Sequence, residues 1–175
     1  EIADAVKAWD PRTITIIGGP FTLRQSQLIF DQSSFDWVFE GAADRTLIQA
    51  LQRKFLSYPL GSDIPGFSYR SNEAGIVHNN KQDLITDLDE IPMPAWDMAD
   101  LTRYSKYDRP GIITNIGENK YAYLFTSRGC PYLCNYCHDV FTKRFVYQST
   151  DNVIAEIELL FEKYGVNEFH IVDDI

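Results

Sequence analysis

The stretch YAYLFTSRGCPYLCNYC, residues 121–137, joins a short apolar run to all three cysteines of the chain. Residues 121–126 favour a β-strand, because aromatic and apolar side chains dominate them. Cys130, Cys134 and Cys137 follow with C-x3-C-x2-C spacing. Three thiols gathered in a loop that follows a strand predict a metal or cluster site.

The thiol chemistry leaves two kinds of site open. Three thiolates bind soft metals or iron–sulfur clusters. A structural zinc site takes four protein ligands, and the only local candidate for the fourth is His138, whose place beside Cys137 makes joint coordination awkward. A cluster held by three cysteines would keep one iron open, and an open metal site is where chemistry occurs.

Composition and charge narrow the class of protein. Of the 175 residues, 45% are hydrophobic and 14% aromatic, so we expect a packed core. Lys and Arg number 16 and Asp and Glu 25, giving a net charge of −9. We expect no nucleic-acid interface, because phosphate binding requires clustered cations. No apolar run approaches the roughly 20 residues of a membrane helix.

The number and spacing of the cysteines point to a compartment. A secreted disulfide framework uses an even number of cysteines spread along the chain. This chain has three, packed into eight residues. A reducing, cytoplasmic setting therefore fits better.

The N-terminal third alternates helical and strand-like segments with short connections. The expected order is helix 1–9, strand 13–17, helix 23–30, strand 36–39 and helix 45–56. Such alternation is typical of a parallel sheet with crossover helices. Gly18 and Gly19 follow the first strand and Gly41 the second, so we expect all three at the carboxyl edge of the sheet, where ligands bind in these folds.

The rest of the chain reads as a connector and a second βαβ unit. Residues 66–79 favour a hairpin, and the segment 88–96 carries two prolines that exclude regular structure. After the cysteines, residues 152–164 favour an amphipathic helix and 168–172 a strand. Asp173 and Asp174 then lie at the carboxyl end of that strand.

The cysteine loop resembles the cluster loop of radical S-adenosylmethionine enzymes. Their pattern is C-x3-C-x-aromatic-C at the end of the first barrel strand, and each position matches here. The resemblance implies that Cys130, Cys134 and Cys137 hold a 4Fe–4S cluster. Its fourth iron would bind the amino and carboxylate groups of S-adenosylmethionine. The implied reaction is reductive cleavage of that cofactor to a 5′-deoxyadenosyl radical.

Two further cofactor contacts follow from the same resemblance. Tyr136, the aromatic residue before the last cysteine, would lie near the adenine of S-adenosylmethionine. The end of the second barrel strand usually contacts the methionyl amine in this family. Asp173 and Asp174 occupy that place here.

The order of motifs is similar to that of the cobalamin-binding subclass, which includes the anaerobic magnesium-protoporphyrin ester cyclase and radical methylases. The motifs are Gly18-Gly19-Pro20, Glu40-Gly41, the 88–94 connector and the cysteine loop. This resemblance implies that Gly18, Gly19 and Gly41 face cobalamin. The subclass usually reads Gly-Glu-Gly-Glu after the second strand, where this chain has a single glycine followed by two alanines.

The resemblance gives an α/β fold in three parts. Residues 1–57 would be the C-terminal part of a Rossmann-like, cobalamin-binding parallel sheet. Residues 58–117 would be a connector with a small hairpin, and 118–175 the N-terminal part of a radical S-adenosylmethionine barrel of the partial TIM type. We interpret the chain as a fragment of a longer protein.

The expected function is that of a radical S-adenosylmethionine enzyme that uses cobalamin for methyl transfer or oxidative cyclisation. Its partners would be a small-molecule substrate and a one-electron reductant such as flavodoxin or ferredoxin. Two alternatives stay open. One is a zinc-stapled binding module without redox chemistry; the other is a radical S-adenosylmethionine enzyme without cobalamin, whose N-terminal sheet is only a scaffold.

Overall fold

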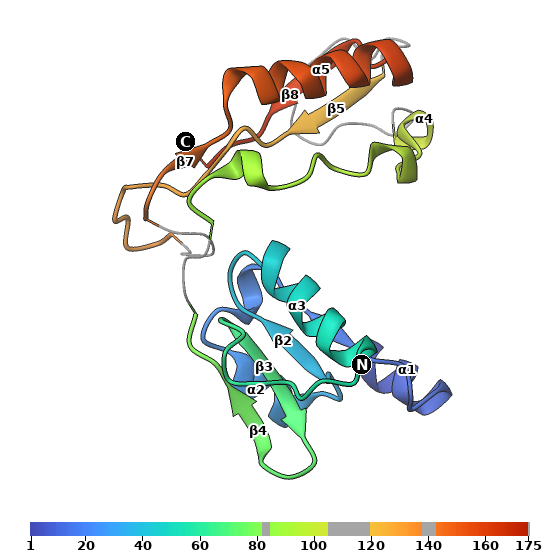
Figure 1. The fold of residues 1–175 in the computed structure, drawn as a ribbon, viewed down its shortest axis with the longest axis vertical. Helices are drawn as coiled ribbons and strands as arrows, with labels where there is room; N and C mark the ends of the chain where they lie inside the picture. The colour runs from blue at the N-terminus through green and yellow to red at the C-terminus, as the bar shows by residue number, and fades with distance from the viewer. Residues whose placement is uncertain (82–84, 105–119, 138–142, 175) are drawn as a thin grey trace. The chain divides into compact units, whose positions relative to one another are not determined.

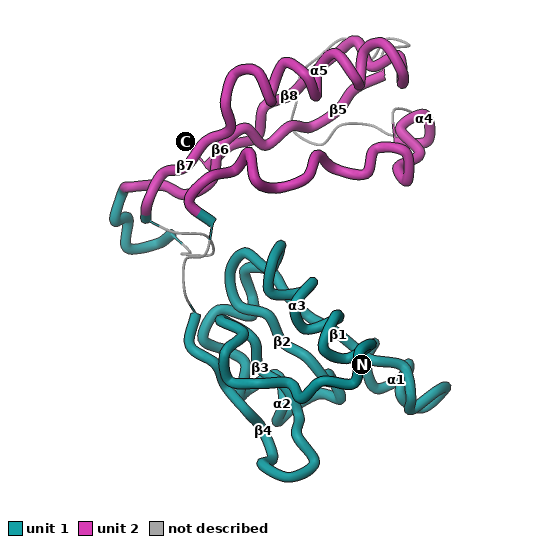
Figure 2. The backbone as a smooth tube through the Cα atoms, viewed as in Figure 1, with its two compact units in different colours: residues 1–85, 132–143 teal, residues 86–131, 144–175 magenta. Residues whose placement is uncertain are grey.

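A computed structural model describes residues 1–81, 85–104, 120–137 and 143–174. The chain divides into two compact units, coloured separately in Figure 2. The first unit is Glu1–Ile85 with Tyr132–Lys143, and the second is Thr86–Pro131 with Arg144–Ile175.

The N-terminal unit contains the alternating elements that the sequence predicts (Figure 1). They are α1 (Ile2–Trp9), β1 (Ile16–Ile17), the 3-10 helix η1 (Pro20–Thr22), α2 (Ser26–Gln32), β2 (Trp37–Phe39), α3 (Asp44–Phe55), β3 (Phe67–Ser71) and β4 (Gly75–His78). The expected strand at 13–17 is shorter than predicted, and the helix expected at 23–30 begins later. The other elements lie within about two residues of their expected bounds.

The sheet of this unit is mixed, which corrects the expectation of a parallel sheet. Its strand order is β1-β2-β3-β4. β1 and β2 are parallel, whereas β3 is antiparallel to both β2 and β4. The physical reason is that β3 begins beside the end of β2, with Phe67 opposite Phe39, and therefore runs the other way. The hairpin expected in the connector thus forms, and it extends the N-terminal sheet.

Helices cover both faces of the sheet. On one face, four aromatic side chains from β2 and β3 pack in a row under the apolar side of α3: Trp37, Phe39, Phe67 and Tyr69. Their neighbouring rings stack, with centroids 4.9 Å apart for Phe39–Phe67 and 5.0 Å apart for Phe67–Tyr69. On the other face, Val38 packs against Ile29 and Phe30 of α2. This three-layer arrangement fixes where the ends of β1 and β2 lie.

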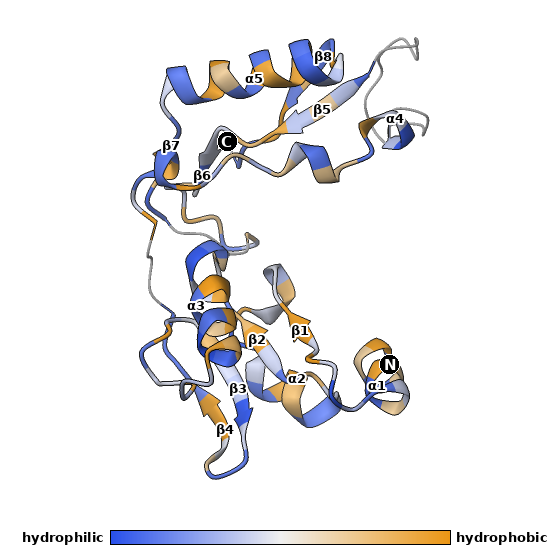
Figure 3. Cartoon of the chain, turned by 45° about the vertical axis from the view of Figure 1, so that its right-hand side comes forward, coloured by the Kyte–Doolittle hydropathy of each residue, from blue (hydrophilic) through white to orange (hydrophobic). Residues whose placement is uncertain are grey.

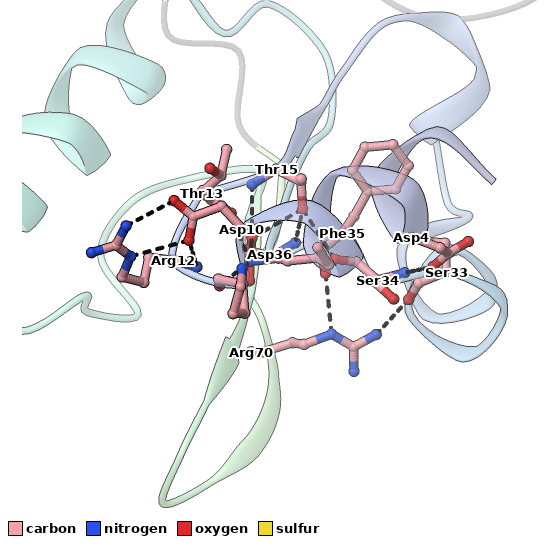
Figure 4. Close-up of polar contacts among 12 residues, drawn as sticks. Asp4, Asp10, Arg12, Thr13, Thr15, Ser33, Ser34, Phe35, Asp36 and Arg70 are labelled. Carbon is pink, nitrogen blue, oxygen red and sulfur yellow. Dashed lines mark hydrogen bonds and ion pairs between the residues drawn. The ribbon is translucent and has the colours of Figure 1, made fainter.

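A polar network holds the amino ends of the two parallel strands (Figure 4). The Asp36 carboxylate accepts hydrogen bonds from the backbone N–H and the hydroxyl of Thr15, at 2.7 and 2.9 Å. Lys7 of α1 pairs with the same carboxylate at 2.6 Å. The Arg70 guanidinium donates to the backbone carbonyls of Phe35 and Ser33. These contacts anchor α1 and β3 to the loops that lead into β1 and β2.

The network predicts a loss of stability in acid. Partial burial acts to raise the pKa of Asp36, but the hydrogen bonds from Lys7 and Thr15 outweigh it, and the pKa lies below its ordinary value. A lowered pKa contributes stability above the unfolded-state pKa of about 3.9, and this contribution is lost as the pH falls through the folded-state pKa. The free energy of unfolding, measured with urea between pH 6 and pH 3, should therefore fall less steeply with decreasing pH in Asp36→Asn than in the unchanged chain. Equal pH slopes would contradict this role.

The second unit contains a βαβ motif and a small antiparallel pair. Its elements are η2 (Leu88–Glu90), η3 (Trp96–Met98), α4 (Leu101–Tyr104), β5 (Tyr121–Leu124), β6 (Ser127–Arg128), β7 (Val146–Tyr147), α5 (Thr150–Tyr164) and β8 (Glu168–Ile171). β5 pairs with β8 in parallel and β6 with β7 antiparallel. The predicted βαβ unit is confirmed, and the barrel beyond it stays a prediction. Within the described ranges, no helix is both long and apolar enough to cross a membrane.

The segment before β5 packs on this βαβ unit. The Trp96 indole N–H donates to the Glu156 carboxylate on α5 at 2.8 Å, and Glu156 is only 6% exposed. Leu101 joins the core beneath α5, which includes Leu124 and Leu160. Figure 3 shows hydrophobic and hydrophilic bands alternating along α5, as expected for a helix with one side on the core and the other exposed. The expected boundary at 117/118 lies outside the described residues, and the three-part division of the chain stays a prediction.

Candidate functional site

The glycines predicted to face a cofactor lie together at one edge of the N-terminal sheet. Gly18 and Gly19 follow β1 and Gly41 follows β2, and because these strands are parallel both turns lie at the carboxyl edge. Gly19 and Gly41 have positive φ angles of 98° and 79°, which favour glycine. A Cβ added at Gly19 would meet no atom within 4 Å. The edge therefore offers backbone without side chains at three glycines, and the space beyond Gly19 is open.

Thr22 joins the two turns, a role that the sequence did not reveal. Its side chain is fully buried. Its hydroxyl lies 2.6 Å from the carbonyl oxygen of Phe39 and 2.8 Å from that of Gly19. A hydroxyl residue three positions after a glycine turn is a local signal that indicates such a backbone contact. The contact to Phe39 is long-range and has no sequence signal.

Gly66, at the start of β3, supports the second turn from the other side. Its carbonyl accepts the Glu40 N–H at 2.8 Å. Its φ angle is 65°, and a Cβ built there would lie 2.7 Å from the Glu40 carbonyl oxygen. The backbones of the hairpin and of the turn after β2 thus approach more closely than any side chain would allow.

The cysteine loop leaves and returns through a narrow neck in the second unit. Ser127 pairs with Tyr147 and Arg128 with Val146 in the β6–β7 ladder. Next to the Ser127–Tyr147 pair, on the side away from the cysteines, the Gln148 N–H donates to the Thr126 carbonyl at 2.8 Å. The neck lies just beyond the carboxyl end of β5, where the sequence predicted that the strand would deliver the chain to the cysteines.

Asp173 and Asp174, which we call the aspartate clamp, lie against the start of the loop. The Asp173 carboxylate accepts the N–H groups of Thr126 and Ser127, and Asp174 accepts the N–H of Gly129 at 2.9 Å. Partial burial acts to raise the pKa of Asp173, but the hydrogen bonds that it accepts from Thr126 and Ser127 lower it below its ordinary value. The predicted position at the strand end is thus observed, and its backbone partners are new.

The three cysteines carry free thiols. Cys130 is half-buried, whereas Cys134 and Cys137 are exposed. Cys130 lies in the second unit and the other two in the first. The Cys137 N–H donates to the Cys134 carbonyl at 3.1 Å, so the last two cysteines share a tight turn. His138, the only local candidate for a fourth zinc ligand, lies outside the described residues.

The donor chemistry of this loop fits an iron–sulfur cluster, because free thiols become the thiolate ligands that such clusters use. Among the described side chains, no group of three or more His, Cys, Asp or Glu residues converges as a metal site. Tyr136 is 89% exposed, so it is not a core aromatic residue and is available to a ligand.

Curated relatives cover nearly the whole chain. The chain is 28% identical to an uncharacterised methyltransferase of Pyrococcus horikoshii and 26% identical to cytidylyl-2-hydroxyethylphosphonate methyltransferase of Streptomyces wedmorensis, each over 99% of the chain and 36% of the relative. It is 28% identical to the anaerobic magnesium-protoporphyrin IX monomethyl ester cyclase of a Synechocystis strain, over 94% of the chain and 31% of that enzyme. The chain thus spans about a third of the length of these relatives. No protein-family model matches it.

Solved structures share its fold. The cobalamin-dependent S-adenosylmethionine radical enzyme OxsB, with aqua-cobalamin and S-adenosylmethionine bound, matches 99% of the chain with a TM-score of 0.70 and 19% identity, over 22% of its own length. The radical S-adenosylmethionine methyltransferase TsrM of Kitasatospora setae, with cobalamin and a [4Fe–4S] cluster bound, matches 93% of the chain with a TM-score of 0.60 and 17% identity, over 31% of its length. The resemblance predicted from the sequence is therefore confirmed: the relatives of this chain include methyltransferases and a cyclase, and its fold matches part of two cobalamin-binding radical S-adenosylmethionine enzymes, OxsB and TsrM.

Proposed function

We propose that the chain is part of a cobalamin-dependent radical S-adenosylmethionine enzyme. One observation carries the proposal: a loop with three free thiols leaves a short neck at the end of β5. This loop lies in a chain of which 99% matches part of a cobalamin-dependent radical enzyme in fold. Residues 1–57 would belong to the cobalamin domain, 58–117 to the connector, and 118–175 would begin a partial barrel with β5, α5 and β8.

Five residues in and beside the cysteine loop have a chemical role in this proposal. Cys130, Cys134 and Cys137 would hold a 4Fe–4S cluster, which supplies one electron for the cleavage of S-adenosylmethionine. Tyr136 offers an exposed aromatic face for the adenine. Asp174 is exposed and offers a carboxylate to the methionyl ammonium group.

The open edge of the N-terminal sheet would receive cobalamin. Gly18, Gly19 and Gly41 place bare backbone there, which permits the close approach of a large planar cofactor. The full enzyme would act on a small-molecule substrate, by methyl transfer or oxidative cyclisation, in a cytoplasmic setting. It would receive electrons from a one-electron reductant such as flavodoxin or ferredoxin.

Metal analysis after anaerobic purification and reconstitution separates this proposal from a zinc-stapled module. We expect about four irons and four sulfides per chain, as for a [4Fe–4S] cluster. Stoichiometric zinc without iron would favour the binding module, because structural zinc is redox-inert.

Cobalamin binding by the full-length protein separates the two radical enzymes. We expect a spectrophotometric titration with aquacobalamin to saturate, and Gly19→Ala to weaken binding by about tenfold, or about 1.4 kcal/mol. The added methyl group would project into the open edge. Gly75→Ala is the matched control, since Gly75 also has a positive φ and open surroundings but lies in the hairpin turn. No cobalamin binding, or equal weakening in both variants, would contradict the proposed edge.

A further inference from the structure

Asp173 makes its hydrogen bonds where the β5–β8 ladder stops. The ladder ends with Leu124 opposite Ile171, and the Val172 N–H still donates to the Leu124 carbonyl at 2.9 Å. Beyond this point the chain turns away so that β6 can pair with β7. The side chain of Asp173 then takes over, and it satisfies N–H groups that lose their strand partner.

Both carboxylate oxygens of Asp173 are engaged. Oδ1 accepts the N–H of Thr126 at 2.7 Å and the N–H of Ser127 at 3.1 Å. Oδ2 accepts the Thr126 hydroxyl at 2.6 Å. Hydrogen bonds to an ionised acceptor are stronger than neutral ones. Ser127 is also 4% exposed, so an unpaired N–H there would be costly.

Asp174 extends the same contact toward the cysteines. It accepts the N–H of Gly129, which is buried, has a φ angle of 86° and directly precedes Cys130. Two consecutive carboxylates therefore hold three of the four residues that lead into the first cysteine. The two residues differ in exposure: Asp174 is exposed and Asp173 is half-buried.

We propose that Asp173 is a positioning residue for the cysteine loop: it fixes the backbone of Thr126 and Ser127, from which Cys130 departs, and it does not contact S-adenosylmethionine. This inference rests on the proposed function, since it concerns how the chain presents its cluster ligands. The two aspartates thus have different roles: Asp174 contacts the cofactor, and Asp173 positions the loop.

The first test is amide hydrogen exchange in the metal-free chain. Asp173→Ala should speed exchange at Thr126 and Ser127 by about tenfold, the factor that corresponds to about 1.4 kcal/mol. Asp173→Asn should retain most of the protection, because its amide oxygen still accepts the two N–H groups. Glu158→Ala, an exposed position in the middle of α5, is the control and should change neither site. Unchanged exchange in Asp173→Ala would overturn the proposal.

The second test uses the full-length protein with its cluster reconstituted. Asp173→Asn keeps the hydrogen-bond acceptor and removes the negative charge, so we expect wild-type iron content and an affinity for S-adenosylmethionine within about twofold of the wild type. Asp174→Asn should weaken that affinity by about tenfold. A similar weakening in Asp173→Asn would show that Asp173 contacts the cofactor and would overturn the proposal. If the unchanged protein takes up no iron, the proposed function fails, while the exchange experiment still tests whether Asp173 positions Thr126 and Ser127.

Discussion

Changing Cys134 to Ala is expected to leave the anaerobically reconstituted chain with almost no iron, where the unchanged chain should take up about four irons. The two remaining cysteines cannot hold a cluster that already has only three protein ligands, and the chain has no other cysteine to replace the lost one. Iron and acid-labile sulfide analysis, together with the visible absorption of the cluster, measures the loss.

Two features of the loop make this result easy to interpret. Cys134 is exposed, so its replacement removes no core packing. The free energy of unfolding, measured with urea, should therefore stay within about 0.5 kcal/mol of that of the unchanged chain. Leu133→Ala is the matched control, because Leu133 is the neighbouring residue and is 83% exposed. It should bind iron normally. A Cys134→Ala chain with full iron content would remove the cysteines from the proposed site.

Changing Gly66 to Ala is expected to destabilise the N-terminal unit by about 2–5 kcal/mol. The left-handed backbone conformation costs an Ala residue about 1–2 kcal/mol. The new Cβ would also lie 2.7 Å from the Glu40 carbonyl oxygen, and such overpacking costs about 1–3 kcal/mol. Urea unfolding followed by tryptophan fluorescence measures the change, since Trp37 is buried in the sheet of this unit.

Gly75→Ala separates the two contributions. Gly75 has a φ angle of 70°, close to the 65° of Gly66, but an added Cβ there meets nothing within 4 Å. It should lose only the conformational part, about 1–2 kcal/mol. Equal losses in both variants would show that the close approach of Gly66 to Glu40 has no energetic weight.

The sequence was sufficient for features that depend on neighbouring residues. Gly165 ends α5 in the left-handed conformation, as a glycine after an amphipathic helix predicts. The glycines after β1 and β2 and the aspartates after β8 also lie at the strand ends where the pattern places them. One local detail differs by a residue: the helix expected at 45–56 begins at Asp44.

The features that the sequence could not supply depend on contacts between distant residues. The direction of β3 follows from where the chain returns to β2, and the periodicity of apolar residues carries no information about direction. Ile16 of β1 is 39% exposed, and β1 lies at the edge of the described sheet, a position that an apolar run does not predict. The bond between Asp173 and Thr126 joins residues 47 positions apart, so no local pattern predicts it.

Electron paramagnetic resonance of the reduced, reconstituted full-length protein, before and after S-adenosylmethionine is added, tests the proposed cluster site. We expect an iron–sulfur signal that changes when the cofactor binds, because a cluster with three cysteine ligands keeps one iron open. A signal that is indifferent to S-adenosylmethionine, or a protein that holds zinc and gives no iron–sulfur signal, would contradict the proposed site.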